Sequence, residues 1–147
     1  MAAVLNLYEH DFYAWTQQQE NYMINHELNN LDLQHLKEEI QIMGASELRE
    51  LDSRLTVLLM HLLKWKYQPN LRGRSWQLTI KEQRRVIERH LRRMPSLKPK
   101  LCDTFSEAYE DAILKTERET GLAETTFPVK CEWSIKQILN EDFFPDC

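Results

Sequence analysis

The most apolar run of the sequence, residues 53–70, holds a single histidine, His61. An imidazole in such surroundings can serve as a general base or a metal ligand, because it titrates near neutral pH and binds transition metals. On a helix, His61 shares one stripe with Arg54 and Lys64, and this stripe is the polar edge. We therefore interpret His61 as a structural histidine that hydrogen-bonds at this edge. An enzyme would instead pair it with an acidic partner such as Glu38, Glu39 or Glu110.

The spacing of histidines and acids does not match a metal-binding pair of helices. Carboxylate-bridged metal sites in helical bundles use Glu-x-x-His, and no glutamate here has a histidine three residues later. The nearest approach is His35 with Glu38 and Glu39, which we interpret as a solvated helix edge. The spacing therefore predicts no metal and no cofactor. A site assembled in space from separate histidines stays open: His10, His26, His35, His61 and His90.

Nucleophilic catalysis has little support in the sequence. With three glycines in all, the chain has no G-x-S-x-G motif and can hardly build a phosphate loop or a dinucleotide fingerprint. Cys102 is expected in the first turns of a helix, close to the helix N-terminus, Lys98 and Lys100, which is a setting typical of reactive thiols. It falls beside Leu101 and Phe105 on the apolar side, so we predict a buried, inert thiol. We predict no catalytic residue, and the residues favour a role other than that of an enzyme.

Charge is segregated along the chain. Residues 1–53 hold 10 acids and 2 bases, residues 54–100 hold 2 acids and 13 bases, and residues 101–147 hold 11 acids and 4 bases. The net charges of these segments are −8, +11 and −7, which give −4 for the whole chain. A basic middle between two acidic ends suits an acidic partner or a phosphate-bearing one.

The basic middle segment gathers much of its charge on one face of a predicted helix and in the loop before it. Six residues are our candidate contacts for phosphates or for an acidic partner: Arg72, Arg74, Lys81, Arg85, Arg89 and Arg92. The alternative is that acidic helices neutralise this face, within the chain or across a homodimer. Exposed pairs of that kind contribute at most a few tenths of a kcal/mol each.

Three aromatic residues, Trp65, Tyr67 and Trp76, flank the same loop. We interpret them first as packing at helix junctions, where large rings bury apolar area. A platform on which single-stranded nucleic acid stacks would use the same mixture of aromatic rings and positive charge. Nucleic-acid binding therefore stays an alternative to protein binding.

Length and composition indicate one soluble helical domain. At 147 residues the chain has the size of one domain, and its low glycine and proline content and abundant Leu, Glu, Lys, Arg and Gln favour helix over sheet. The first residues have no basic region of a signal peptide, and the apolar run at 57–63 is too short to cross a bilayer. Three cysteines without a C-x-x-C pair indicate free thiols in a reducing compartment. We expect a cytoplasmic protein without a membrane association.

Apolar periodicity and capping residues predict an all-α bundle of about five to six helices, with a long central helix over 46–67. The first helix is expected over 8–26, with Gln19 interrupting an aromatic face, and the second over 32–43, capped by Asp32 and stopped at Gly44. Pro69 should end the central helix. The next helices are expected from Ser75 or Thr79 to about Arg93, from about Pro99 to Gly121, and from a capping box at Ser134-x-x-Gln137, after which Phe143, Phe144 and Pro145 should pack back onto the body.

Several segments together resemble a known family: YEHDFYAWTQQQ, LDLQHLKEEIQIMG, SRLTVLLMHLLKWKYQP, RSWQLTIKEQRRVIERHL, AYEDAILKTERETGL and ILNEDFFP. This is a family of short bacterial proteins, common in cyanobacteria, that is catalogued as the twenty-ninth of the domains of unknown function. The resemblance runs from about Tyr8 to Pro145, and HLLKWKYQ and RSW are its most specific motifs. It implies an all-helical protein that is one domain over residues 1–147. It brings no activity, cofactor or catalytic residue.

The sequence predicts several amphipathic helices but no catalytic residue and no metal site. We therefore expect a helical protein-interaction module, possibly one that binds a second copy of itself, whose basic helix faces an acidic surface. The alternative is a nucleic-acid-binding or regulatory protein that uses the basic helix over 79–93 against phosphates.

Overall fold

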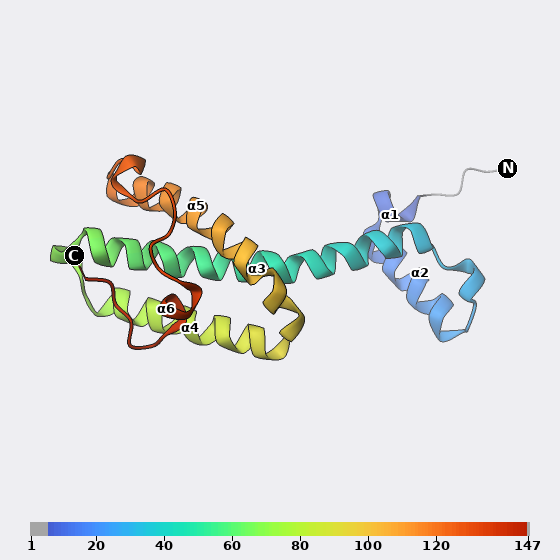
Figure 1. Cartoon of the computed structure of the whole chain (residues 1–147). Helices are drawn as coiled ribbons and strands as arrows, with labels where there is room; N and C mark the ends of the chain where they lie inside the picture. The colour runs from blue at the N-terminus through green and yellow to red at the C-terminus, as the bar shows by residue number, and fades with distance from the viewer. Residues whose placement is uncertain (1–5, 147) are drawn as a thin grey trace. The chain divides into compact units, whose positions relative to one another are not determined.

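The computed structural model describes residues 6–146, most of which are helical (Figure 1). Six α-helices follow one another within these described residues: α1 (Leu7–His10), α2 (Phe12–Ile24), α3 (Leu33–Tyr67), α4 (Arg74–Arg93), α5 (Leu101–Thr120) and α6 (Ile135–Leu139). Short 3₁₀ turns lie between them at Leu28–Asn30, Pro69–Leu71, Pro95–Lys100 and Glu124–Thr126. Since the described residues contain no strand, the all-α prediction is confirmed.

The chain divides into two compact units, one up to Ala45 and one from Ser46. α3 belongs to both, with residues 33–45 in the first unit and residues 46–67 in the second. The predicted central helix over 46–67 is therefore present, as the second part of a longer helix. That the chain acts as one domain stays a prediction.

In the first unit, Asp32 organises the junction between α2 and α3. Its carboxylate accepts hydrogen bonds from Trp15 Nε1 at 3.0 Å, from His35 Nδ1 at 2.6 Å and from the backbone N–H of His35 at 3.3 Å. The last of these is the predicted cap of the helix. The backbone N–H of Asp32 donates to Gln19 Oε1 at 2.8 Å. Trp15 and Gln19 are consequently the buried residues of α2, so Gln19 belongs to the inner side of that helix.

Tyr8 attaches α1 to the first part of α3. Its hydroxyl donates to a carboxylate oxygen of Glu39 at 2.6 Å, and its ring stacks on that of His35 with 4.0 Å between centroids. The hydrogen bond to Glu39 raises the pKa of Tyr8 to about 12. His35 and Glu39 thus serve packing and hydrogen bonding between α1 and α3.

The predicted first helix over residues 8–26 is wrong, because the chain breaks at Asp11. The carboxylate of Asp11 accepts the backbone N–H of Ala14 at 3.0 Å and so caps α2, while its extended backbone ends α1. α2 then ends at Ile24, and His26 has a positive φ of 57°. The sequence pattern joined α1 and α2 because their apolar residues share a helical period across the break.

The predicted helix boundary at Gly44 is also wrong, since α3, which is 35 residues long, continues through it. A glycine inside a helix costs about 1 kcal/mol relative to alanine, and the strong helix formers on both sides offset this cost. Glycine stops a helix when it adopts a left-handed backbone. Among the described glycines only Gly121 does so, with φ 76°. The predicted end before Pro69 is confirmed, because α3 ends at Tyr67.

The core of the second unit forms along the later part of α3, beside which α4 and α5 run in Figure 1. Leucines at alternating spacings of three and four residues along α3 have no exposed surface: Leu51, Leu55, Leu58 and Leu62. Ile80 and Ile87 of α4 and Ala108 of α5 are fully buried in the same cluster. Met60, Leu59 and Leu63 are buried as well, so the central helix becomes apolar on more than one side as it proceeds.

The ends of the later helices agree with the sequence, with two differences at their starts. α4 begins at Arg74 with Gly73 as its N-cap, so neither Ser75 nor Thr79 caps it, and Pro99 lies in the 3₁₀ turn before α5. Gly121 ends α5 in the left-handed conformation, and Ser134 and Gln137 form the predicted capping box of α6. The C-terminal segment returns to the body, where Phe144 packs against the core.

Candidate functional site

α4 carries a row of cationic side chains on its exposed side. Lys81, Arg85, Arg89 and Arg92 are all exposed, and we call these four residues the basic face. They recur at three- and four-residue intervals, so the face is about 16 Å long at 1.5 Å per residue. Over its whole length α4 has seven bases and two acids, Glu82 and Glu88, which gives it a net charge of +5.

No residue of the basic face forms an ion pair with any other described residue. The ion pairs of residues 6–146 that involve Lys or Arg are Arg54–Glu50, Lys64–Glu119 and Lys66–Glu132. Arg74, at the start of α4, is exposed and also has none. Within the part of the chain that the structure describes, α5 therefore forms no ion pair with the basic face.

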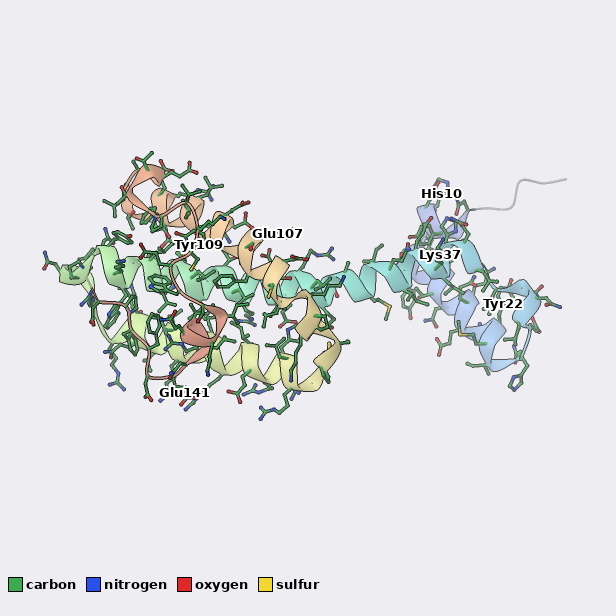
Figure 2. All side chains as sticks on the ribbon, in the orientation of Figure 1. His10, Tyr22, Lys37, Glu107, Tyr109 and Glu141 are labelled. Carbon is green, nitrogen blue, oxygen red and sulfur yellow. The ribbon has the colours of Figure 1, made fainter. Side chains whose placement is uncertain are left out.

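Arg84 lies beside Arg85 in sequence but is buried, whereas Arg85 is exposed. Arg84 is 3% exposed, and its guanidinium donates to the backbone carbonyls of Ile138 at 2.6 Å, Glu141 at 3.3 Å and Phe143 at 2.6 Å. It also lies over the ring of Phe144, 5.5 Å from the centroid. Burial lowers the pKa of Arg84, yet the group stays charged because an arginine pKa lies far above neutral pH. Arg84 thus holds the C-terminal segment against α4 by hydrogen bonds. Glu141 of this segment is labelled in Figure 2.

Arg72, one of the predicted contacts, is engaged within the protein. Its Nε donates to the carbonyl of Trp65 at 2.6 Å, and its guanidinium lies 5.2 Å from the centroid of the Trp65 ring. The other two aromatic residues that flank this loop also contact side chains of the protein. Lys64 lies over the ring of Trp76, and the ring of Tyr67 meets that of Phe127 edge to face. These rings therefore serve packing, as the first interpretation of the sequence has it.

A shallow hollow runs along the basic face. It is lined by Leu78, Lys81, Glu82, Arg85, Val86 and Arg89. Leu78 is half exposed, so apolar surface lies between the cationic groups. A second hollow at the N-terminal end of α4 is lined by Arg74 and Lys81 together with Glu141 and Asp142 of the C-terminal segment. The basic face therefore combines positive charge with apolar contact area.

His61 hydrogen-bonds to its own helix. Its Nδ1 lies 2.8 Å from the carbonyl oxygen of Val57, to which the protonated nitrogen donates, and burial lowers its pKa. No hydrogen bond or ion pair of the described residues joins His61 to a carboxylate. Glu39 pairs with Tyr8, and Glu110 lines a hollow with Ile113 and Leu114 instead.

Of the five histidines, His90 is the one that the structure brings to a cluster of possible metal ligands. It lies with Glu47 and Glu50, and ligand atoms of the three residues are all within 4.8 Å of one another. Sequence reasoning named His90 but missed the two glutamates. The available signal was a Glu-x-x-Glu pair at the start of the helix predicted over 46–67 and a histidine near the end of the next predicted helix, which antiparallel packing places side by side.

The cysteines differ in their surroundings. Cys102 is exposed, so the prediction of a buried thiol is wrong, because α5 turns that position outward from the core. Cys131 is partly buried, and burial raises the pKa of its thiol. Cys147 lies outside the described residues.

The family model described as domain of unknown function DUF29 matches residues 7–144, which include most of both units and the whole basic face. The chain belongs to the DUF29 family. No curated protein and no solved structure matches it. Among the residues that the structure describes, this DUF29 protein has no helix that is both long enough and apolar enough to span a membrane.

Proposed function

We propose that this DUF29 protein is a helical protein-interaction module that binds an acidic, partly apolar surface on the basic face of α4. The observation that carries the proposal is the exposure of Lys81, Arg85, Arg89 and Arg92 without an ion pair among the described residues. Four like charges along one helix steer an oppositely charged partner to the face and set its orientation.

The mixture of side chains on the basic face favours a protein over a nucleic acid. Leu78 and Val86 line the same hollow as the cations and offer contact to apolar side chains of a partner. A phosphodiester backbone would use the charges alone. Bases would need rings to stack on, and the nearby Trp65 and Tyr67 pack against other side chains of the protein.

A second copy of the chain offers a surface of the required chemistry. Residues 1–45 contain seven acids and one base, a net charge of −6. The first unit also exposes nine large apolar side chains: Phe12, Tyr13, Met23, Ile24, Leu28, Leu33, Ile40, Ile42 and Met43. Exposed apolar residues in such number are typical of an interaction surface. We therefore name the first unit of a second copy as the partner to test first.

We place this function in the cytoplasm. Of the described cysteines, Cys102 and Cys131 are free thiols, which suits a reducing compartment.

The test is a charge reversal combined with a measurement of molar mass. We expect the parent chain, 17.7 kDa as a monomer, to give about twice that mass by light scattering at low salt. The Arg85→Glu, Arg89→Glu variant should be monomeric, and high salt should weaken the association of the parent because exposed charges are screened. The matched control is Lys98→Glu, Lys100→Glu, which makes the same change in net charge at two exposed positions outside α4.

A parent chain that stays monomeric at low salt, or a double reversal on α4 that associates like the control, contradicts self-association through this face. The nucleic-acid alternative is tested in the same variants by gel shift with single- and double-stranded DNA and with RNA. Salt-sensitive binding that is lost in the α4 variant but kept in the control would show that the basic face binds nucleic acid instead.

A further inference from the structure

A second cluster of polar side chains lies where the C-terminal end of α4 meets α3. α4 returns along α3 after the turn at 68–73, so His90 comes opposite Glu47, and the two side chains are hydrogen-bonded at 2.9 Å. Glu47 and Glu50 are three residues apart and therefore share one face of α3. All three residues belong to the second unit.

The geometry of this cluster is close to what one metal ion requires. Bonds of roughly 2.0–2.2 Å to oxygen or nitrogen place two ligand atoms no more than about 4.4 Å apart. The ligand atoms of Glu47, Glu50 and His90 are all within 4.8 Å of one another. The side chain of Glu50 can move the short distance by which the ligand atoms are too far apart. It is 48% exposed, and its ion pair with Arg54 is long, at 3.9 Å.

His90 is the fixed ligand of the cluster. Its side chain is 9% exposed, so packing between α3 and α4 already holds the ring with Nε2 toward the carboxylates. Its Nδ1 is buried and has no hydrogen-bond partner among the described residues. Nε2 donates its proton to the Glu47 carboxylate, which can only accept, so an ion would take the place of that proton. Nε2 would then present its lone pair to the ion while Nδ1 carries the ring proton. A ligand held in this way is preorganised for binding.

We propose that Glu47, Glu50 and His90 form a binding site for one divalent transition-metal ion. An imidazole with two carboxylates suits Zn²⁺, Mn²⁺ or Fe²⁺, whereas Ca²⁺ and Mg²⁺ prefer oxygen ligands alone. Three protein ligands leave coordination positions open to water or to a further ligand. The ion would also join α3 to the end of α4. The site is separate from the basic face and does not depend on the function proposed above.

The experiment is a calorimetric titration of the purified, chelator-treated full chain with Zn²⁺ and, in parallel, with Mn²⁺. Mn²⁺ is included because thiolates such as that of the exposed Cys102 bind it poorly. We expect one ion per chain. Glu50→Gln keeps the shape of an exposed side chain and should weaken binding at least tenfold. Glu82→Gln, a matched change of an exposed glutamate outside the cluster, should bind like the parent.

Tenfold weaker binding in Glu50→Gln but not in Glu82→Gln, for either ion, supports the site. No stoichiometric binding by the parent, or equal affinity in the parent and Glu50→Gln, overturns it. Because His90 is buried, His90→Gln is used only with circular dichroism in parallel, as a second variant that should also lose binding if it folds.

Discussion

Arg84 and Arg85 are neighbours in α4, yet the first is 3% exposed and the second is exposed. The guanidinium of Arg84 has donors spread in a plane, which lets it reach three carbonyls of the C-terminal segment at once. Arg85 has none of these contacts and belongs to the basic face. One side chain type is thus buried in hydrogen bonds at one position and exposed at the next.

Replacing Arg84 by lysine should lower the free energy of unfolding by roughly 2–4 kcal/mol, because a single ammonium group leaves some of the buried carbonyls without a donor. Urea unfolding followed by tryptophan fluorescence measures the effect. Arg85→Lys is the control and should change stability by less than about 0.5 kcal/mol. Equal effects of the two substitutions would show that Arg84 does not carry the contacts described for it.

Histidines show how far residue types alone could predict a site. The sequence drew attention to His61, because its setting is apolar, but the structure gives it a hydrogen bond within its own helix. His90 stands among charged residues in the sequence and gave no comparable signal. Its partner Glu47 is 43 positions away, and only the packing of α4 on α3 brings the two together.

At the scale of elements, α3 differs most from its prediction. Glycine at position 44 was interpreted as a helix stop, but a hypothetical Cβ there would meet no atom within 4 Å, and the helix continues on both sides. The identity of one residue gives only its own helix propensity. Whether a helix continues through that residue depends on the sum of the propensities along the helix.

Gly44→Ala should therefore raise the helix content slightly and stabilise α3 by about 0.5–1 kcal/mol. Thermal unfolding followed by far-ultraviolet circular dichroism measures this. Gly121→Ala is the matched control and should destabilise by roughly 1–2 kcal/mol, since Gly121 has φ 76° and alanine is strained there. Destabilisation by Gly44→Ala would mean that α3 is interrupted at this position.

At the scale of the whole molecule, the two units differ in what they bury. Trp15 is the one buried apolar residue among the described residues of the first unit, while the core cluster lies in the second. Regions with little buried apolar surface open at a lower free energy than the core. The first unit combines this small core with exposed apolar residues and negative charge, which is the composition expected of a segment that a partner covers.

Hydrogen exchange should reveal the difference directly. We expect backbone amides of 12–24 in α2 to exchange faster than those of 51–63 in α3, when both are followed by mass spectrometry under native conditions. Amides of 108–116 in α5 serve as the comparison and should be protected like those of 51–63, since both stretches contribute to the core. Equal protection of α2 and the core would contradict the small contribution of the first unit to stability.

The sequence by itself determined the helical class, the leucine seam of α3, the stop before Pro69, the left-handed cap at Gly121 and the capping box at Ser134. Each of these depends on residues within about one or two helical turns of each other, so local preference and periodicity are sufficient. Tertiary structure alone decided the exposure of Cys102, the contacts of Arg84, the grouping of Glu47, Glu50 and His90, and the lack of ion pairs between the basic face and the rest of residues 6–146. Those features depend on which faces of different helices meet, and residues far apart in the chain settle that.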